Sequence, residues 1–63
     1  MNFNANFERI LQERNIKKSE LAKELELDRT TIYKYANGEV LPSLEVVEKL
    51  TIIFNCSYDE LLK

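Results

Sequence analysis

The chain of 63 residues contains no histidine and only one cysteine, one glycine and one proline. Without histidine and a second cysteine, it lacks the usual ligands of a zinc site and the commonest general base. A single glycine cannot build a glycine-rich phosphate-binding loop, and no pair of carboxylates accompanies a plausible buried cleft. We therefore expect that the protein is not an enzyme and that it holds no metal, no cofactor and no small-molecule ligand.

The single cysteine and the lack of long apolar runs bear on the cellular compartment. Cys56 has no partner for an internal disulfide, and we expect a small buried apolar side chain in a reducing cytosol. No apolar run approaches the roughly 18 residues of a membrane span, and the start lacks the basic-then-apolar pattern of a signal peptide. The expected protein is cytoplasmic and has no membrane partner.

The composition predicts one compact all-α domain over residues 1–63. This length lies near the lower limit for folding without disulfides or metals. Leu, Ile, Glu and Lys dominate, which favours helix over strand. Apolar residues at helical spacing predict five helices: one from near Phe3 to near Arg14, then 18–25, 29–36, 44–54, and a short one after Ser57.

The same spacing predicts which side chains are buried and where the helices begin and end. The expected core residues are Phe3, Phe7, Ile10, Leu11, Ile16, Leu21, Ala22, Leu25, Ile32, Tyr35, Leu44, Val47, Leu50, Ile53, Phe54 and Leu61. The expected N-caps are Asp28, Ser43 and Ser57, the last in a capping box with Glu60. Asn15, Gly38 and Asn55 are expected to end helices, the first two in a left-handed conformation.

The net charge of −2 conceals an uneven distribution of charge along the chain. Residues 14–38 carry six cationic side chains against four acidic ones, whereas the remainder carries three against seven. Local field rather than net charge decides which surface an anionic partner approaches. The basic segment therefore favours a nucleic acid as its partner, although a plain solvated helix surface would also carry lysines.

The helix at 29–36 presents side chains that suit contact with DNA. Ile32 and Tyr35, three residues apart, form its inward face. The residues left outside are Arg29, Thr30, Tyr33 and Lys34, followed by Asn37. These are hydrogen-bonding groups and cations, the chemistry that reaches base edges and phosphates. With the helix at 18–25 and a short turn, they predict a helix-turn-helix over about residues 18–36.

The chain resembles, nearly end to end, the lambda-repressor/Cro-like helix-turn-helix family, which includes the xenobiotic-response-element-type regulators. The motifs that carry the resemblance are Glu20-Leu21-Ala22, Thr31-Ile32-x-x-Tyr35, Asn37-Gly38, Pro42-Ser43-Leu44 and Ser57-x-x-Glu60-Leu61. The resemblance implies a compact five-helix DNA-binding domain whose third helix is the recognition helix in the major groove. It also implies a double-stranded DNA partner.

The resemblance assigns roles to individual residues of this chain. It implies base contacts from Arg29, Thr30, Tyr33 and Lys34, and backbone contacts from Lys18 and Asn37. Lys17 and Thr31 complete the expected phosphate contacts, because free amides at a helix start attract phosphate. One of the two threonines is expected to bond at the helix start instead. Arg14 is a weaker phosphate candidate.

Two of these residues have alternative explanations. Arg29 has acidic neighbours in Glu26 and Asp28, so an ion pair with either would account for it. Tyr33 would contact a thymine methyl or a phosphate, or lie over the surface of the helix at 18–25.

The sequence departs from the family pattern at three points. Glu26 stands where the family has a turn glycine, which implies a different turn or a strained backbone costing about 1 kcal/mol. Lys18 replaces a glutamine and adds a charge. Leu11 and Ala36 stand where many relatives pair an arginine with a glutamate; replacing both partners leaves no unpaired buried charge.

The expected function is sequence-specific DNA binding as a repressor from a phage or mobile element. Because one domain reaches few base pairs, a homodimer on a near-palindromic operator is expected. Ile52, Tyr58 and Leu62 are the candidate dimer surface. One alternative is a protein-interaction module, antirepressor or antitoxin-like, with the same fold. Another is that the chain is the DNA-reading head of a longer repressor.

Overall fold

The computed structural model describes residues 2–63 and places five helices among them. Their bounds are Phe3–Glu13 for α1, Lys18–Leu25 for α2, Arg29–Asn37 for α3, Leu44–Phe54 for α4 and Tyr58–Leu62 for α5. No strand occurs within this described range, so the expected all-α fold is confirmed. Residue 1 of the expected domain lies outside the described residues. None of the described helices has the length and apolar character needed to cross a membrane.

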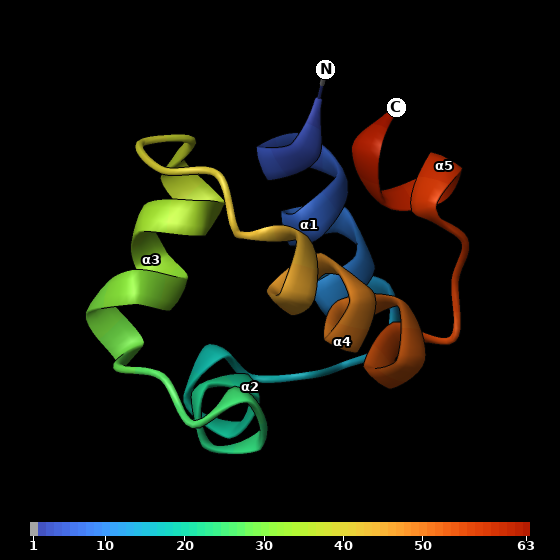
Figure 1. The fold of residues 1–63 in the computed structure, drawn as a ribbon. Coiled ribbons are helices and arrows are strands. Elements are labelled where there is room, and N and C mark those ends of the chain that lie inside the picture. Colours follow the sequence, from blue (N-terminus) through green and yellow to red (C-terminus); the bar gives the residue numbers. More distant parts are fainter. Residues whose placement is uncertain (1) are drawn as a thin grey trace.

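The helix α1 occupies the centre of the fold, with α3 packed on one side and α5 on the other (Figure 1). The helix α2 packs against α3, and α4 packs against α5. The two ends of the chain lie close together, where the side-chain amide of Asn6 donates to the main-chain oxygen of Leu61 at 3.1 Å. The pair α2 and α3 is thereby left at one edge of the molecule, away from α5 (Figure 1).

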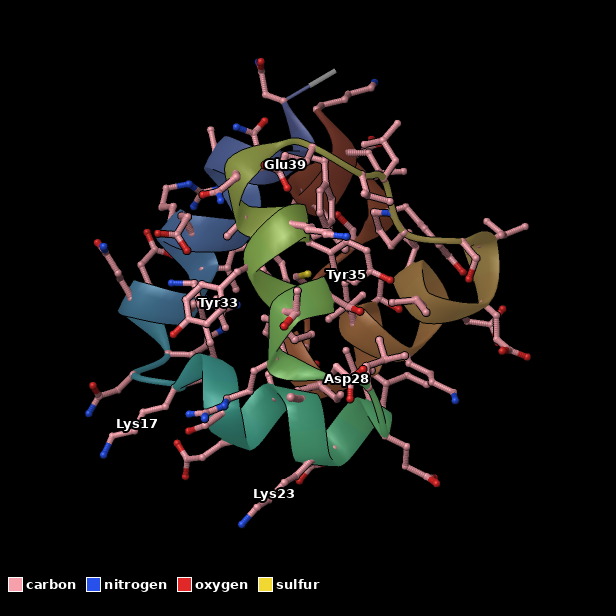
Figure 2. The ribbon with its side chains drawn as sticks, turned by 90° about the vertical axis from the view of Figure 1, so that its left-hand side faces the viewer. Lys17, Lys23, Asp28, Tyr33, Tyr35 and Glu39 are labelled. Carbon is pink, nitrogen blue, oxygen red and sulfur yellow. The ribbon has the colours of Figure 1, made fainter. Side chains whose placement is uncertain are left out.

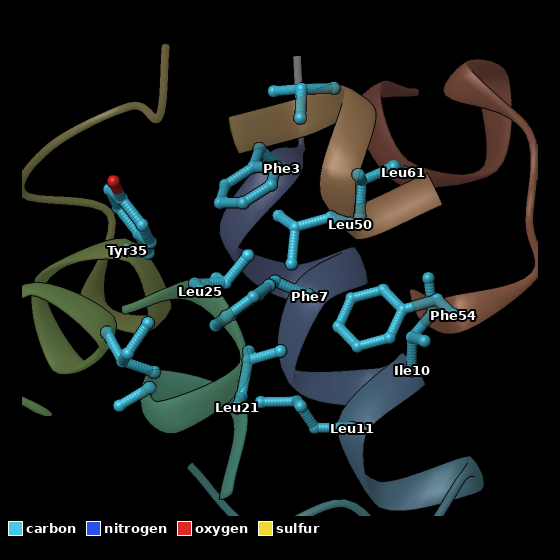
Figure 3. Close-up of a cluster of buried hydrophobic side chains, with 13 residues drawn as sticks. Phe3, Phe7, Ile10, Leu11, Leu21, Leu25, Tyr35, Leu50, Phe54 and Leu61 are labelled. Carbon is cyan, nitrogen blue, oxygen red and sulfur yellow. The ribbon is translucent and has the colours of Figure 1, made fainter. Parts of the chain in front are cut away.

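One hydrophobic core draws side chains from all five helices (Figure 3). The ring of Phe7 lies 6.0 Å from the ring of Phe54 and meets the ring of Tyr35 edge-on at 6.3 Å. Such aromatic pairs stabilise by about 0.5–1.5 kcal/mol beyond the area they bury. Tyr35 therefore ties α3 to α1 and determines which face of α3 is turned outward. The buried residues are Phe3, Phe7, Ile10, Leu11, Leu21, Ala22, Leu25, Ile32, Tyr35, Val47, Leu50, Phe54 and Leu61.

Leu44 was expected in this core, and that prediction is wrong. Its side chain is 75% exposed, while Val47 in the next turn of α4 is buried. Leu44 is the first residue of α4 and lies on the rim of an open apolar hollow with Leu41 and Leu62. The core therefore buries Val47 but does not reach Leu44 in the first turn of α4. Helical spacing shows which face of a helix is turned inward, but it does not show how far along the helix the core extends.

The turn between α2 and α3 begins with a left-handed residue, the second of the two alternatives that the missing glycine left open. Glu26 has φ of 57° and ψ of 42°, and the amide of Leu27 donates to the main-chain oxygen of Ala22 at 2.9 Å. This bond satisfies a carbonyl that would otherwise be left free at the helix end. Asn15 and Gly38 also have positive φ, at 59° and 78°, which confirms their expected conformation.

The N-caps of the helices follow expectation at two places and fail at a third. The hydroxyl oxygens of Ser43 and Ser57 accept from the first-turn amides of α4 and α5 at 3.3 and 3.1 Å. Asp28 occupies the cap position of α3, but its carboxylate accepts no capping bond, so that prediction is wrong. The amide of Thr31, which a capping carboxylate would take, donates instead to the main-chain oxygen of Asp28 at 3.1 Å. No bond from Glu60 back to the Ser57 amide completes the expected box within residues 2–63.

Candidate nucleic-acid interface

Two short helices joined by residues 26–28 form the outer edge of the molecule. Figure 2 views α3 from outside, with α2 crossing beneath it. Ile32 and Tyr35 are buried and hold one side of α3 against the core. Because helical neighbours three residues apart share a face, the residues between these two anchors are directed outward. This geometry is that of a helix-turn-helix.

The outward side of α3 carries the residues that the sequence assigned to base contacts. Arg29, Thr30, Tyr33 and Lys34 are all exposed, and Tyr33 is 50% exposed. Asn37 is exposed in the last turn of α3, whereas Thr31 is half-buried. The five exposed side chains therefore lie on one continuous helix surface. Arg29 lies at its start and Asn37 at its end.

Four of the candidate residues gather around a single hollow of about 380 Å³ between α1, α2 and α3. They are Lys17, Lys18, Arg29 and Tyr33. Tyr33 and Lys17 lie on the same side of α3, toward α1 (Figure 2). Thr30, Thr31, Lys34 and Asn37 do not line this hollow. The fold thus brings the start of α2 and the start of α3 together.

The guanidinium of Arg29 forms no ion pair within residues 2–63. The alternative explanation, a pair with Glu26 or Asp28, is therefore not what this structure contains. An unpaired guanidinium at the exposed start of α3 keeps all of its donors available to an acceptor outside the chain.

Lys18 is held more tightly than the sequence indicated. Its ammonium lies 2.7 Å from the Oε1 of Glu8 on α1 and 5.6 Å from the centre of the Tyr33 ring. Tyr33 therefore lies beside the start of α2, in line with the alternative that places it over this helix, and it remains 50% exposed. Its DNA contact stays a prediction. Glu8 was not among the expected site residues, because it is ten positions away in sequence and only the packing of α1 against the other helices brings it there.

The start of α2 is stabilised from within its own first turn. The backbone amide of Lys17 donates to the Oε1 of Glu20 at 3.2 Å. Lys17 itself is exposed and forms no ion pair in the described chain. A carboxylate in the first turn also complements the positive end of the helix dipole.

One subsidiary expectation about this surface is wrong. Neither Thr30 nor Thr31 forms a side-chain hydrogen bond at the start of α3 within the described part of the chain. Arg14, the weaker phosphate candidate, uses its Nε to donate to the main-chain oxygen of Phe54 at 2.9 Å. Since that oxygen has no partner within α4, Arg14 has a structural role, and its phosphate contact stays a prediction.

The candidate dimer residues lie on other faces of the molecule. Ile52 is 75% exposed, Tyr58 is 42% exposed, and Leu62 is half-buried. Ile52 borders a hollow with residues of α2, whereas Leu62 borders a second hollow with Leu41 and Leu44. The structure therefore does not bring Ile52 and Leu62 together in one hollow.

Burial raises the pKa of one group on the inner side of α3 and of one group beyond α4. Burial raises the pKa of the Tyr35 phenol. Burial, followed by the charge of Glu60, raises the pKa of the Cys56 thiol, while Arg14 and Arg9 act in the opposite direction. Cys56 is half-buried and packs against the core, which agrees in kind with the expected unreactive side chain.

These observations define a five-helix domain built around a helix-turn-helix. A family model described as "Helix-turn-helix" matches residues 7–61, and the chain belongs to this family, in its lambda-repressor/Cro-like form. The family is one of DNA-binding regulators rather than of enzymes. The sequence-based assignment to it is confirmed.

One similar protein is the HTH-type transcriptional activator BcrR of Enterococcus faecalis. It is 31% identical over 62 residues, which cover 98% of this chain and 30% of that protein. The chain thus spans about a third of the length of this relative. No solved structure gives a significant match.

Proposed function

We propose that this domain binds double-stranded DNA in a sequence-specific manner, with α3 in the major groove. The observation that carries the proposal is the unpaired Arg29 at the exposed start of α3, beside the lysines that open α2. Base contacts are assigned to Arg29, Thr30, Tyr33 and Lys34, and phosphate contacts to Lys17, Lys18, Thr31 and Asn37. Residues 1–63 are proposed to act as one such domain.

The two groups of residues make different energetic contributions. A guanidinium that binds the O6 and N7 of guanine discriminates against other bases by about 1–3 kcal/mol. A lysine that contacts a phosphate adds no sequence information, but it releases a counterion from the DNA. Each such contact makes the slope of log affinity against log salt concentration more negative by about 0.9. Arg29 is therefore proposed as the chief determinant of sequence preference, and Lys17 and Lys18 of overall affinity.

We further propose that the domain binds as a homodimer on a near-palindrome. Half-sites for two recognition helices lie about 34 Å apart along the same side of DNA. The domain measures 25 × 22 × 21 Å across its Cα atoms. One copy is therefore shorter than this spacing, so reading two half-sites takes two copies. Ile52, Tyr58 and Leu62 are the proposed contact surface, supported by the exposure of the first two.

The proposed biological role is transcriptional repression, in which a bound dimer excludes polymerase from a promoter. The similar Enterococcus protein is named an activator, and the same DNA contacts serve either outcome. The position of the operator relative to the promoter decides between repression and activation. A reporter gene with the operator placed either upstream of the promoter or overlapping it shows whether expression falls or rises.

The test of DNA binding is selection from a random duplex library, followed by affinity measurements with Arg29→Ala. Loss of preference at one position of each half-site is expected, with residual binding to any duplex. Arg9→Ala is the matched control, because Arg9 pairs with Glu13 on α1 and does not line the hollow between α1, α2 and α3. Failure to enrich any sequence at low salt would contradict the proposal.

The second candidate is a protein-interaction module, antirepressor or antitoxin-like. The exposure of Leu41 and Leu44, which no feature of α3 explains, favours it. In that case Arg29→Ala would leave partner binding unchanged, and Leu44→Ser would weaken it.

A further inference from the structure

Glu8 reaches from α1 to the first residue of α2. Its Oε1 lies 2.7 Å from the ammonium of Lys18 and is itself shielded from solvent. The side chain of Lys18 is 26% exposed and that of Glu8 is 40% exposed. Glu8 is the acidic residue that lines the hollow shared by the cations of α2 and α3.

The position of Lys18 explains why it is paired. An ammonium at the start of a helix meets the positive end of the helix dipole, which is unfavourable without a nearby anion. The Glu8 carboxylate supplies that anion, and the face of the Tyr33 ring supplies a second attractive surface at 5.6 Å. Lys18 is therefore confined between α1 and α3.

We infer that Glu8 is a positioning residue that sets how much Lys18 contributes to phosphate binding. This inference rests on the proposed function. In the free protein the Glu8 carboxylate neutralises part of the charge of the Lys18 ammonium. A DNA phosphate competes with Glu8 for that charge, so Glu8 reduces the attraction that Lys18 exerts on any DNA backbone.

This arrangement affects all DNA sequences alike. A phosphate contact is made with operator and with random DNA, so weakening it lowers both affinities by a similar factor. The sequence preference carried by Arg29 is then left unchanged. Glu8 thus lowers the affinity for DNA of any sequence by a similar factor and leaves the ratio of operator binding to random binding unchanged.

The test is Glu8→Gln, which removes the charge and retains the shape and the oxygen acceptor. Affinity for a mixed-sequence duplex of about 20 base pairs and for the selected operator is expected to rise together. The expected rise is on the order of threefold to tenfold at low salt. The slope of log affinity against log salt concentration is expected to become more negative by about 0.9. Glu13→Gln is the matched control, since it removes the same charge from a glutamate of α1 that pairs with Arg9 and Arg14.

A second variant separates the role of Lys18 from a general change in charge. In a Lys18→Met background, Glu8→Gln is expected to leave the salt dependence unchanged, because the phosphate contact is already absent. Circular dichroism confirms that each variant is folded. An equal effect of Glu8→Gln and Glu13→Gln, or none from either, would overturn the inference while leaving the proposed function intact. If the unaltered chain binds no duplex at all, the proposed function and this inference both fail.

Discussion

The Nε of Arg14 donates to the main-chain oxygen of Phe54 at 2.9 Å, which joins the end of α1 to the end of α4 across 40 residues of sequence. Phe54 is the last residue of α4, so its carbonyl has no partner within the helix. This bond therefore satisfies a carbonyl at the end of α4 that has no local partner. It also gives Arg14, which was considered for a DNA contact, a structural role.

Replacing Arg14 with Met is expected to lower the free energy of unfolding by about 1–3 kcal/mol, because a hydrogen bond from a charged group is lost and the Phe54 carbonyl is left unpaired. Urea unfolding measures the change. Arg9→Met, which removes an exposed pair with Glu13, is the control and is expected to cost about 0.3–0.5 kcal/mol. Equal costs for the two variants would show that the contact with Phe54 contributes nothing.

Replacing Glu26 with Gly is expected to stabilise the fold by about 1 kcal/mol, since a non-glycine residue at φ of 57° is strained. Thermal unfolding followed by circular dichroism is the measurement. Glu24→Gly is the comparison, because Glu24 lies inside α2 and the same substitution there should destabilise by about 1 kcal/mol. A loss of stability at both positions would contradict the interpretation of the turn.

The double replacement of Ile52 and Tyr58 with Lys is expected to abolish dimerisation, because two lysines on each copy would face one another across the proposed contact surface. Sedimentation and operator affinity report the effect. Val40→Lys is the control: Val40 is apolar and 44% exposed but is not part of the proposed surface. Unchanged sedimentation and unchanged operator affinity in the double variant would remove these residues from the dimer proposal.

Stability is expected to decline as the pH rises past about 8.5, the ordinary pKa of a thiol. Burial raises the pKa of Cys56 in the folded state, so the unfolded chain loses this proton first and becomes favoured at higher pH. The stabilising effect is fully present below the unfolded pKa and is lost as the pH approaches the folded value. Thermal unfolding of the original chain and of Cys56→Ala between pH 7 and 9.5 measures it; the variant should show the shallower decline.

Helix positions were predictable because each depends on local signals. The spacing of Phe3, Phe7 and Ile10 marks α1, and the hydroxyl of Ser43 marks the start of α4. The left-handed residue at Glu26 was one of two alternatives that the missing family glycine left open, and the structure decides between them. These features depend on neighbours within about four residues, which any sequence displays directly.

The exposure of Arg29 and Tyr33 was likewise predictable. Ile32 and Tyr35, three residues apart, mark the inward face of this helix, and Arg29 and Tyr33 fall outside that face. The capping bond of Asp28 was not, because the amide it would take is satisfied by a main-chain oxygen. The Thr31 amide can donate either to the Asp28 carboxylate or to the Asp28 main-chain oxygen, and the backbone geometry of this one turn decides between them.

The sequence by itself determined the five helices, the helix-turn-helix family and the face of α3 that is turned outward. Only the tertiary structure decided the partners of the charged side chains: Lys18 with Glu8, Arg14 with Phe54, and Arg29 with none among residues 2–63. The physical reason is range. Helix formation and capping act between near neighbours, whereas an ion pair or a long-range hydrogen bond depends on which helices pack together, and that is settled by the core as a whole.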